Sequence, residues 1–446
     1  MPVNGLRIAA GVVAAAGLLV AGFLVLRDGG DEQRPVRDRL PIQPTVVGKS
    51  VLVDVSGAVL EEFNGDCVSS RVSYLCLRVR DELLAADEHL PARGGLTIRT
   101  TVDRRLQQSA QQAIDRRVRS DDKPLAALAM VVPGTGDIRA MATNRPLVDK
   151  VGALAYQQGS TAMVYTLAAA LESGLRFEDG FPYAAAYRAP SYSAFKNCKG
   201  ENVAEPAHSV FNAKRDHSDF TTLRSGTWAA ENTFFLRLTE EVGLCESVTM
   251  ARRLGLARAD GHKVMEFETF SLGVNEVDPV TAAGTYATLA ARGKHCEPRA
   301  VAEVSDGSKV LRSFPPRCRD VLDPAVADAV TNVLADGLAR SPLKGLGRDA
   351  AGMAGASDSY TAAWYAGYTP DLASAVALGV PGRGAFDQRL VDVTLGGRRY
   401  ERVEGTSIPA PIWKESMTAA LSGLPGTAFT KADTARFGGC RDRCAN

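Results

Sequence analysis

The stretch GSTAMVYTLAAALESG, which begins at Gly159, holds a serine whose hydroxyl could act as a nucleophile. Ser160 opens a long apolar run, and a serine before a helix lies at the partly positive helix end. A serine hydroxyl is a poor nucleophile until a neighbouring base takes its proton. Met163, three positions on, carries no basic group. Ser160 is therefore a nucleophile, a former nucleophile, or only a helix cap.

The helix that follows Ser160 is predicted to be buried on all sides. A surface helix keeps a polar face, and this one has almost none. Its apolar positions are Met163, Val164, Leu167, Ala168, Ala169, Ala170 and Leu171.

Two hairpins are expected around this central helix. LAALAMVVPGTGDIRAMAT and TAAWYAGYTPDLASAVALGV are each two apolar runs separated by a turn that contains proline. The patterns between them are mostly helical. Strands at both ends with helices between them predict an antiparallel central sheet, closed by the first and last segments and flanked by helices. The fold class is α/β (α+β).

Two helices have clear end signals. Asp103 can cap one, and Asp278 with Pro279 begins another that ends at Gly293. The first has an apolar stripe of Leu106, Ala110, Ala113, Ile114 and Val118.

Composition excludes some functions. The 446 residues are 45% hydrophobic and 23% charged, which is typical of a globular protein. The net charge is +1 and the basic residues are scattered, so no nucleic-acid partner is expected.

The amino terminus differs from the rest. Residues 8–26 carry no charge, and at about 1.5 Å per residue they nearly span a hydrocarbon core of roughly 30 Å. We interpret them as an uncleaved anchor, with a cleaved secretory signal as the alternative. Both interpretations export the chain that follows, and flanking charges favour a cytoplasmic amino terminus.

An even number of cysteines in an exported chain suggests disulfides. The eight cysteines fall into local couples, although the sequence alone leaves their pairing open. No metal or cofactor is expected, because Cys440 and Cys444 have no histidine nearby and the five histidines form no ligand pair.

Several ordered stretches resemble the transpeptidase domain of class A penicillin-binding proteins, of the serine β-lactamase and DD-transpeptidase superfamily. They are GGLTIRTTVDRRLQQSAQQAI, ALAMVVPGTGDIRAMATN, SLGVNEVDPVTAAGTYATLAARG, AAWYAGYTPDLASAVALG and SIPAPIWKESM. The resemblance covers residues 95–429 and implies that fold, with a helical subdomain, after one transmembrane helix.

CVSSRVSYLCLRVRDELL is similar to the disulfide-bearing junction between the glycosyltransferase and transpeptidase domains of some class A proteins. The predicted domains are an anchor (1–27), a linker (28–48), a junction remnant (49–94), the transpeptidase-like domain (95–429) and a tail (430–446). We expect no glycosyltransferase domain. Four local disulfides are predicted: Cys67–Cys76, which follows the family junction, Cys198–Cys245, Cys296–Cys318 and Cys440–Cys444.

The resemblance implies three catalytic elements, and each is degenerate here. Met163 takes the place of the lysine that would follow Ser160, and its thioether fills nearly the volume of a lysine stem without the amine. GTWAAENTFF leaves only Asn232 of a Ser-x-Asn element, with Ala230 and Glu231 before it. The Lys-Thr-Gly strand is represented by Met353, Ala354, Gly355 and Ala356.

Some parts remain. The backbone N–H groups of Ser160 and Ala356 could still form an oxyanion hole, which needs backbone geometry only. Lys196, Lys199 and His208 are the candidate substitute bases, with solvated loop residues as the alternative interpretation. Glu231 could also act as a base, but its carboxylate would repel an anionic substrate.

The sequence predicts a pseudo-transpeptidase, because three sites became apolar while the framework signatures stayed intact. It would be a single-pass plasma-membrane protein, largely extracytoplasmic, that binds peptidoglycan or another cell-wall synthase. The alternatives are a transpeptidase or penicillin-acylating enzyme that uses Ser160 with a rearranged base, and a sensor that binds muropeptides or β-lactams without reacting.

Overall fold

The computed structural model describes residues 49–147, 154–213, 219–381 and 389–445. The described residues, from Lys49 onward, belong to one compact unit. The predicted span at residues 8–26 and the linker at 28–48 lie outside the described residues. Among the residues that are described, no helix is both long and apolar enough to cross a membrane.

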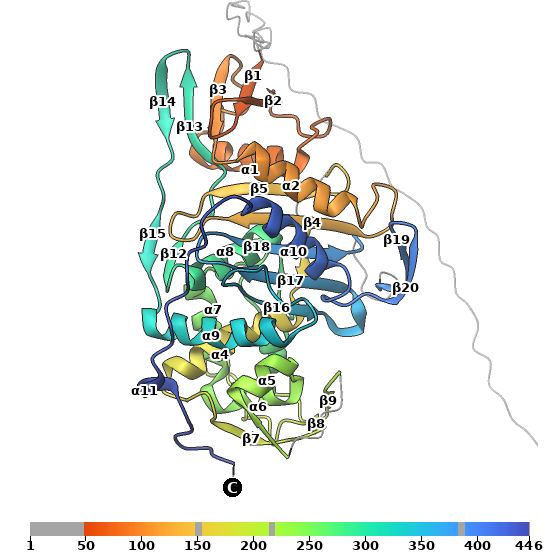
Figure 1. Cartoon of the computed structure of the whole chain (residues 1–446), viewed down its shortest axis with the longest axis vertical. Coiled ribbons are helices and arrows are strands. Elements are labelled where there is room, and N and C mark those ends of the chain that lie inside the picture. Colours follow the sequence, from red (N-terminus) through yellow and green to blue (C-terminus); the bar gives the residue numbers. More distant parts are fainter. Residues whose placement is uncertain (1–48, 148–153, 214–218, 382–388, 446) are drawn as a thin grey trace, which may run out of the picture. The chain divides into compact units, whose positions relative to one another are not determined.

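A five-stranded antiparallel sheet, the central sheet, lies in the middle of this unit (Figure 1). The predicted hairpins are its pairs β4–β5 and β17–β18, and β4 pairs with β18 so that Ala127 lies opposite Ala377. The predicted closure of the sheet by first and last segments is therefore confirmed. In spatial order the strands are β16 (Ala351–Ala356), β17 (Ala362–Tyr368), β18 (Ala373–Gly379), β4 (Leu125–Val131) and β5 (Ile138–Thr143).

Helices cover both faces of the central sheet (Figure 1). In β4, Ala126 and Leu128 belong to the hydrophobic cluster of α2 and α10, whereas Leu125 and Ala127 belong to that of α4, α8 and α9. Because both faces are buried, the strands are continuous apolar runs. The helices are α2 (Arg104–Asp115), α4 (Met163–Glu172), α8 (Pro279–Ala290), α9 (Pro324–Arg340) and α10 (Pro409–Ala420).

The predicted helix starts are confirmed. The Asp103 carboxylate accepts the backbone N–H groups of Arg105 and Leu106, and Asp278 accepts that of Thr281. Both helices end earlier in the chain than the sequence predicts. Val118 is buried but lies beyond α2, and α8 ends at Ala290 because Arg292 and Gly293 have φ angles of 55° and 89°.

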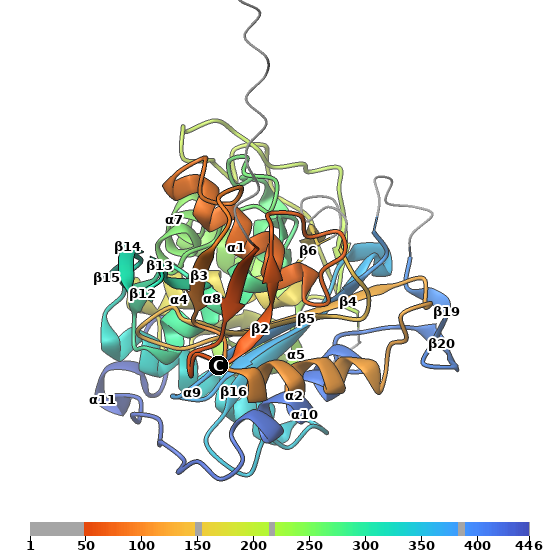
Figure 2. The same cartoon turned by 90° about the horizontal axis from the view of Figure 1, so that it is seen from above.

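A second sheet, the amino-terminal sheet, mixes distant parts of the sequence. Its order is β14–β13–β3–β1–β2, and β13 pairs with β3 so that Val301 lies opposite Thr100. The predicted boundary at residue 95 therefore falls between strands of one sheet. Figure 2 shows this sheet from above with helix α1 (Ser73–Ala86). Its strands are β1 (Ser50–Val53), β2 (Val59–Phe63), β3 (Leu96–Thr100), β13 (Val301–Asp306) and β14 (Lys309–Ser313).

The helix after Ser160 is buried as predicted, because every residue of α4 except Glu172 is buried. Three further helices pack around it: α5 (Leu223–Ala229), α6 (Asn232–Val242) and α7 (Leu244–Leu254).

The remaining elements are short. The helical ones are η1 (Gly159–Ala162), η2 (Glu268–Leu272), η3 (Asp358–Tyr360) and α11 (Thr434–Phe437). The strands are β6 (Tyr156–Gln157), β7 (Gly180–Pro182), β8 (Ala186–Tyr187), β9 (Val210–Phe211), β10 (Phe220–Thr222), β11 (Glu276–Val277), β12 (Lys294–Cys296), β15 (Cys318–Asp320), β19 (Val391–Leu395) and β20 (Arg398–Arg402).

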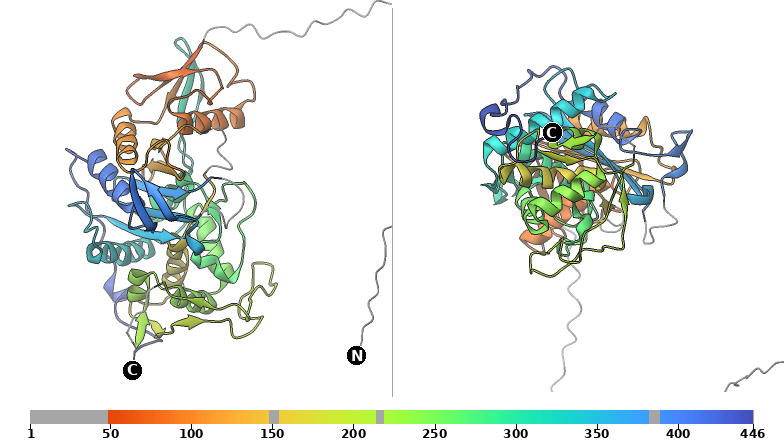
Figure 3. Two further views of the ribbon diagram at one scale, coloured as in Figure 1. Left: turned by 90° about the vertical axis from the view of Figure 1, so that its right-hand side faces the viewer. Right: turned by 90° about the horizontal axis from the view of Figure 1, so that it is seen from below.

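The eight cysteines form four disulfides, and each joins the predicted pair: Cys67–Cys76, Cys198–Cys245, Cys296–Cys318 and Cys440–Cys444. The last of these closes a loop in the carboxyl-terminal segment, which lies against the helical region (Figure 3).

Asp179 holds this disulfide loop. Its fully buried carboxylate accepts the backbone N–H groups of Arg441, Asp442 and Arg443, and that of Arg176. Burial raises the pKa of Asp179, but these four bonds outweigh it and leave the pKa below its ordinary value.

Candidate functional site

Ser160 lies in the 3₁₀ turn η1, which packs between strand β16 and turn η2. Its side chain is half-buried. Neither η1 nor α4 has a side-chain cap, and within the described residues the Ser160 hydroxyl makes no hydrogen bond. The helix-cap interpretation is therefore wrong: α4 starts three residues later, at Met163, after the intervening 3₁₀ turn.

Three glycines allow the backbone of η1 to lie against its neighbours. Gly159 has a φ of +58°, and a Cβ there would lie 2.4 Å from the carbonyl oxygen of Ala356. A Cβ on Gly355 would lie 2.5 Å from the carbonyl oxygen of Gln158, and one on Gly273 would lie 2.4 Å from the Gly159 nitrogen. Any side chain would force these segments apart. The sequence pointed to Gly355 but not to Gly159 or Gly273.

Two buried tyrosines support η1 from within the core. Tyr286 donates its hydroxyl to the Thr161 carbonyl oxygen at 2.9 Å, and the Tyr165 hydroxyl lies 3.2 Å from Gln158 Oε1. Burial raises the pKa of both hydroxyls, so each stays protonated and can donate. Sequence reasoning missed both residues, because only the tertiary contact distinguishes them from ordinary core tyrosines.

The two methionines at the predicted lysine positions belong to one hydrophobic cluster. Met163 is fully buried and Met353 is 6% exposed. Ala351, Met353 and Gly355 are the buried positions of β16, whereas Gly352, Ala354 and Ala356 are half-buried. Met163 and Met353, at the positions where the resemblance implies lysines, are therefore part of the apolar core.

The backbone N–H of Ala356, one of the two predicted oxyanion-hole donors, is not used in the strand ladder. The Ser357 N–H donates to the Ala362 carbonyl oxygen at 2.9 Å. Bonded and non-bonded pairs alternate in an antiparallel ladder, so Ala356, opposite Ala363, directs its N–H away from β17. Gly159 lies next to this nitrogen. The oxyanion hole itself remains a prediction.

The stretch predicted to be the second degenerate element connects α5 to α6. Ala230 ends α5 in the left-handed conformation with a φ of 50°, and buried Glu231 precedes α6. The Asn232 side chain donates to the carbonyl oxygen of Phe211 in β9 at 3.0 Å. Helix α6 contacts η2, which contacts η1.

The candidate bases lie on exposed loop positions. Lys196, Lys199 and His208 are exposed, and none is hydrogen-bonded to Ser160 within the described ranges. His208 is linked to this region through its partner, because its Nδ1 lies 3.3 Å from Glu268 Oε1 in η2, which contacts η1.

Two surface hollows of the described residues lie elsewhere. One is lined by residues near β19 and the other by residues of α10, and neither includes Ser160, Met163 or Met353.

This arrangement defines a serine DD-transpeptidase type of fold. A solved structure of the penicillin-binding protein PonA1 from Mycobacterium tuberculosis superposes with a TM-score of 0.68 at 25% identity, over 82% of this chain and 94% of that chain. The D,D-transpeptidase domain of a peptidoglycan glycosyltransferase from Eggerthella lenta has a TM-score of 0.60 at 18% identity, over 85% of this chain and all of that chain, and shows the fold alone.

The sequence comparisons agree. Penicillin-binding protein 1A of Mycobacterium tuberculosis is 30% identical over 374 residues, which are 78% of this chain and 43% of that protein. Penicillin-binding protein 2D of Bacillus subtilis is 25% identical over 352 residues, which are 75% of this chain and 46% of that protein. The chain thus spans less than half the length of these relatives. No protein-family model matches it.

The chain's homologues and structural neighbours are therefore transpeptidase domains of penicillin-binding proteins, over about 75–80% of its length. The predicted resemblance is confirmed. No separate glycosyltransferase domain occurs among the residues that the structure describes.

Proposed function

We propose that this protein is a non-catalytic relative of the penicillin-binding transpeptidases that acts by binding in cell-wall synthesis. The observation that carries the proposal is the burial of Met163 and Met353 in one apolar cluster beside η1. The positions that would supply a base and a cation instead complete the hydrophobic core.

The expected loss of catalytic rate supports this proposal. A positioned general base contributes roughly 10²–10⁴ in rate, and residues that act as a unit lose most of their effect when one is removed. In this proposal Met163 replaces the base and Ala230 replaces the serine hydroxyl. Met353 and Ala354 replace the side chains that would hold the substrate carboxylate. Oxyanion-hole assistance alone leaves too little rate for transpeptidation.

The proposed location is the outer face of the plasma membrane. Residues 8–26 would anchor the chain as a single span, and the remainder would be extracytoplasmic. The proposed partner is a peptidoglycan strand or another cell-wall synthase.

A second candidate function is acylation by β-lactams through Ser160. It is favoured by the half-buried Ser160 hydroxyl, which makes no hydrogen bond within the described residues, and by the Ala356 N–H that points away from β17. In this alternative His208 or another group would take the proton of the Ser160 hydroxyl.

Labelling of the full chain with a fluorescent penicillin separates the two candidates. PonA1 of Mycobacterium tuberculosis, whose structure has been solved in complex with penicillin V, is the positive control. We expect no covalent adduct on the wild type or on Ser160→Ala. An adduct that forms on the wild type and disappears in S160A would overturn the non-catalytic proposal. Calorimetric heat without an adduct would indicate a sensor that binds without reacting.

A further inference from the structure

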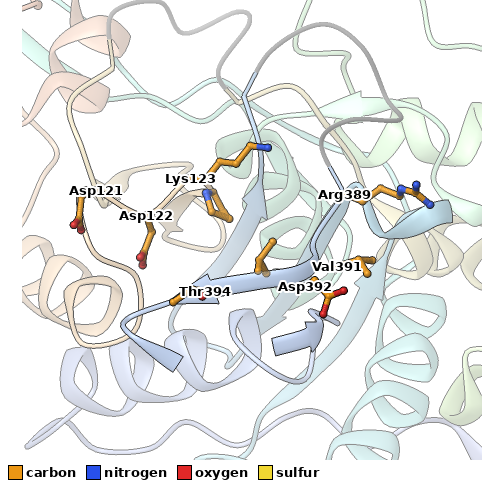
Figure 4. Close-up of a pocket in the computed structure, with 9 residues that line it drawn as sticks. Asp121, Asp122, Lys123, Arg389, Val391, Asp392 and Thr394 are labelled. Atoms are coloured by element: carbon orange, nitrogen blue, oxygen red, sulfur yellow. The ribbon is translucent and has the colours of Figure 1, made fainter. Parts of the chain in front are cut away.

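A hollow of about 650 Å³ lies beside the hairpin β19–β20 (Figure 4). Its volume is within the range of small-ligand sites. One wall is formed by residues 121–124 and the other by Arg389 and residues 391–394.

Asp122 fixes the two walls to each other. Its Oδ2 accepts the Gly396 N–H of the hairpin at 2.8 Å and the Arg119 N–H at 2.7 Å. Gly396 is so close that a Cβ there would lie 2.7 Å from the Arg117 carbonyl oxygen. These contacts fix the hairpin β19–β20 to the segment that forms the first wall, and the Asp122 carboxylate is already hydrogen-bonded.

The charged groups of the hollow differ in whether they have a partner. Asp122 is bonded to backbone N–H groups, and Asp392 pairs with Arg399 at 3.1 Å. Within the described residues, the side chains of Asp121, Lys123 and Arg389 make no hydrogen bond or ion pair. Two cations and one carboxylate thus remain available to a ligand.

These groups are distributed unevenly around the hollow. In Figure 4, Asp121 and Asp122 stand on one side, Arg389 stands on the other, and Lys123 lies between them. Val391 and Val393 add apolar surface. A ligand with one negative and one positive end would be matched, whereas a plain anion or cation would meet a like charge.

The hollow is separate from the Ser160 site but opens at the same end of the central sheet. The residues Ala356, Ala363, Leu378 and Ala126 are successive partners across β16, β17, β18 and β4. Three strand spacings of about 4.8 Å place the start of β4 roughly 14 Å from Ala356. The Leu390 N–H also donates to the Tyr360 carbonyl oxygen, which ties the start of β19 to the turn that follows β16.

We propose that this hollow binds a short zwitterionic peptide, with its carboxylate at Lys123 and Arg389 and its ammonium group at Asp121. The hollow shares no residue with the Ser160 site, so this proposal stands whether or not the protein is catalytic.

The test is a calorimetric titration of the full chain with trialanine, its N-acetylated form and its carboxyl-terminal amide. We expect trialanine to bind and each blocked form to bind about fivefold more weakly. Each blocked form loses one exposed charge pair, and such a pair contributes about 1 kcal/mol, which corresponds to this change in Kd. The double variant Lys123→Ala/Arg389→Ala should abolish the preference for the free carboxylate. The variant Asp121→Asn should abolish the preference for the free amine.

The matched control is Lys431→Ala, which removes an exposed lysine away from the hollow and should leave all three affinities unchanged. The proposal is overturned if trialanine gives no heat, or if it binds no better than its blocked forms. It is also overturned if both preferences survive in the variants, all of which replace exposed side chains and leave the core intact.

Discussion

The Asn232 side chain donates to the carbonyl oxygen of Phe211 at 3.0 Å. The sequence predicts Asn232 to be the polar side chain kept from a Ser-x-Asn element, and in the structure it links strand β9 to the start of α6. Next to it, the Thr233 N–H donates to Asn212 Oδ1 at 2.9 Å. The asparagine therefore has a structural use that explains its presence without any chemistry.

Replacing Asn232 tests this structural use. We expect Asn232→Ala to lower the free energy of unfolding by about 1 kcal/mol, the usual value of one hydrogen bond, and to increase proteolysis near β9. Urea unfolding and limited proteolysis measure both effects. A variant as stable and as resistant as the wild type would show that the bond to Phe211 contributes nothing.

The close approach of η1 to β16 makes Gly159 a sensitive position. Gly159→Ala combines a left-handed backbone with a contact of 2.4 Å to Ala356, whereas Gly134, with a φ of +77°, has nothing within 4 Å of its Cβ position. We expect G134A to cost about 1 kcal/mol, and G159A to cost about 2 kcal/mol more. Thermal unfolding of both variants provides the comparison, and equal melting temperatures would refute the predicted contact.

The apolar cluster predicts that a restored lysine is poorly tolerated. Met163 is fully buried, so Met163→Lys should destabilise the protein by roughly 3–5 kcal/mol, because the amine would be buried without a partner. The control Met163→Leu should cost less than about 1.5 kcal/mol. Denaturant unfolding distinguishes the two variants. If Met163→Lys and Met163→Leu are equally stable, polar groups around position 163 accept the ammonium, and the proposed function loses its main support.

Asp179 predicts a dependence of stability on pH. Its pKa is lowered in the folded protein, so it stabilises the fold above its unfolded pKa of about 4, and this contribution is lost as pH falls through the lower folded pKa. Asp179→Asn should remove about 2 kcal/mol at pH 7 and less at pH 3.

The measurement is the difference in free energy of unfolding between wild type and D179N from pH 7 to pH 3. Burial also lowers the pKa of His295, but this residue is present in both proteins and cancels in the difference. A difference that is constant with pH would contradict the role assigned to the Asp179 charge.

Local signals predicted most of the fold. Asp103 and Asp278 each cap a helix through bonds to residues two or three positions away, and the turn of β4–β5 is determined by Pro133 and the glycines after it. Such signals act within a few residues, so the sequence carries them directly. The four disulfides also join cysteines that are neighbours in chain order.

Contacts between distant segments could not be predicted from the residues alone. Nothing in the sequence near Asp179 indicates that its carboxylate receives three N–H groups from residues 441–443. The partner of Asn232 and the contact of Gly273 with Gly159 likewise depend on how helices and turns pack. The degenerate site stays a prediction from the motifs, and the contact of η1 with β16 required the structure.

The pairing of Thr100 in β3 with Val301 in β13 has a consequence for how the molecule matures. During synthesis β3 emerges from the ribosome long before β13, so one edge of the amino-terminal sheet stays unpaired until two-thirds of the chain has been made. Until β13 has been synthesised, the unpaired edge of β3 can associate with other chains. A chain truncated before β13 would therefore be an aggregation-prone fragment and not a smaller folded protein.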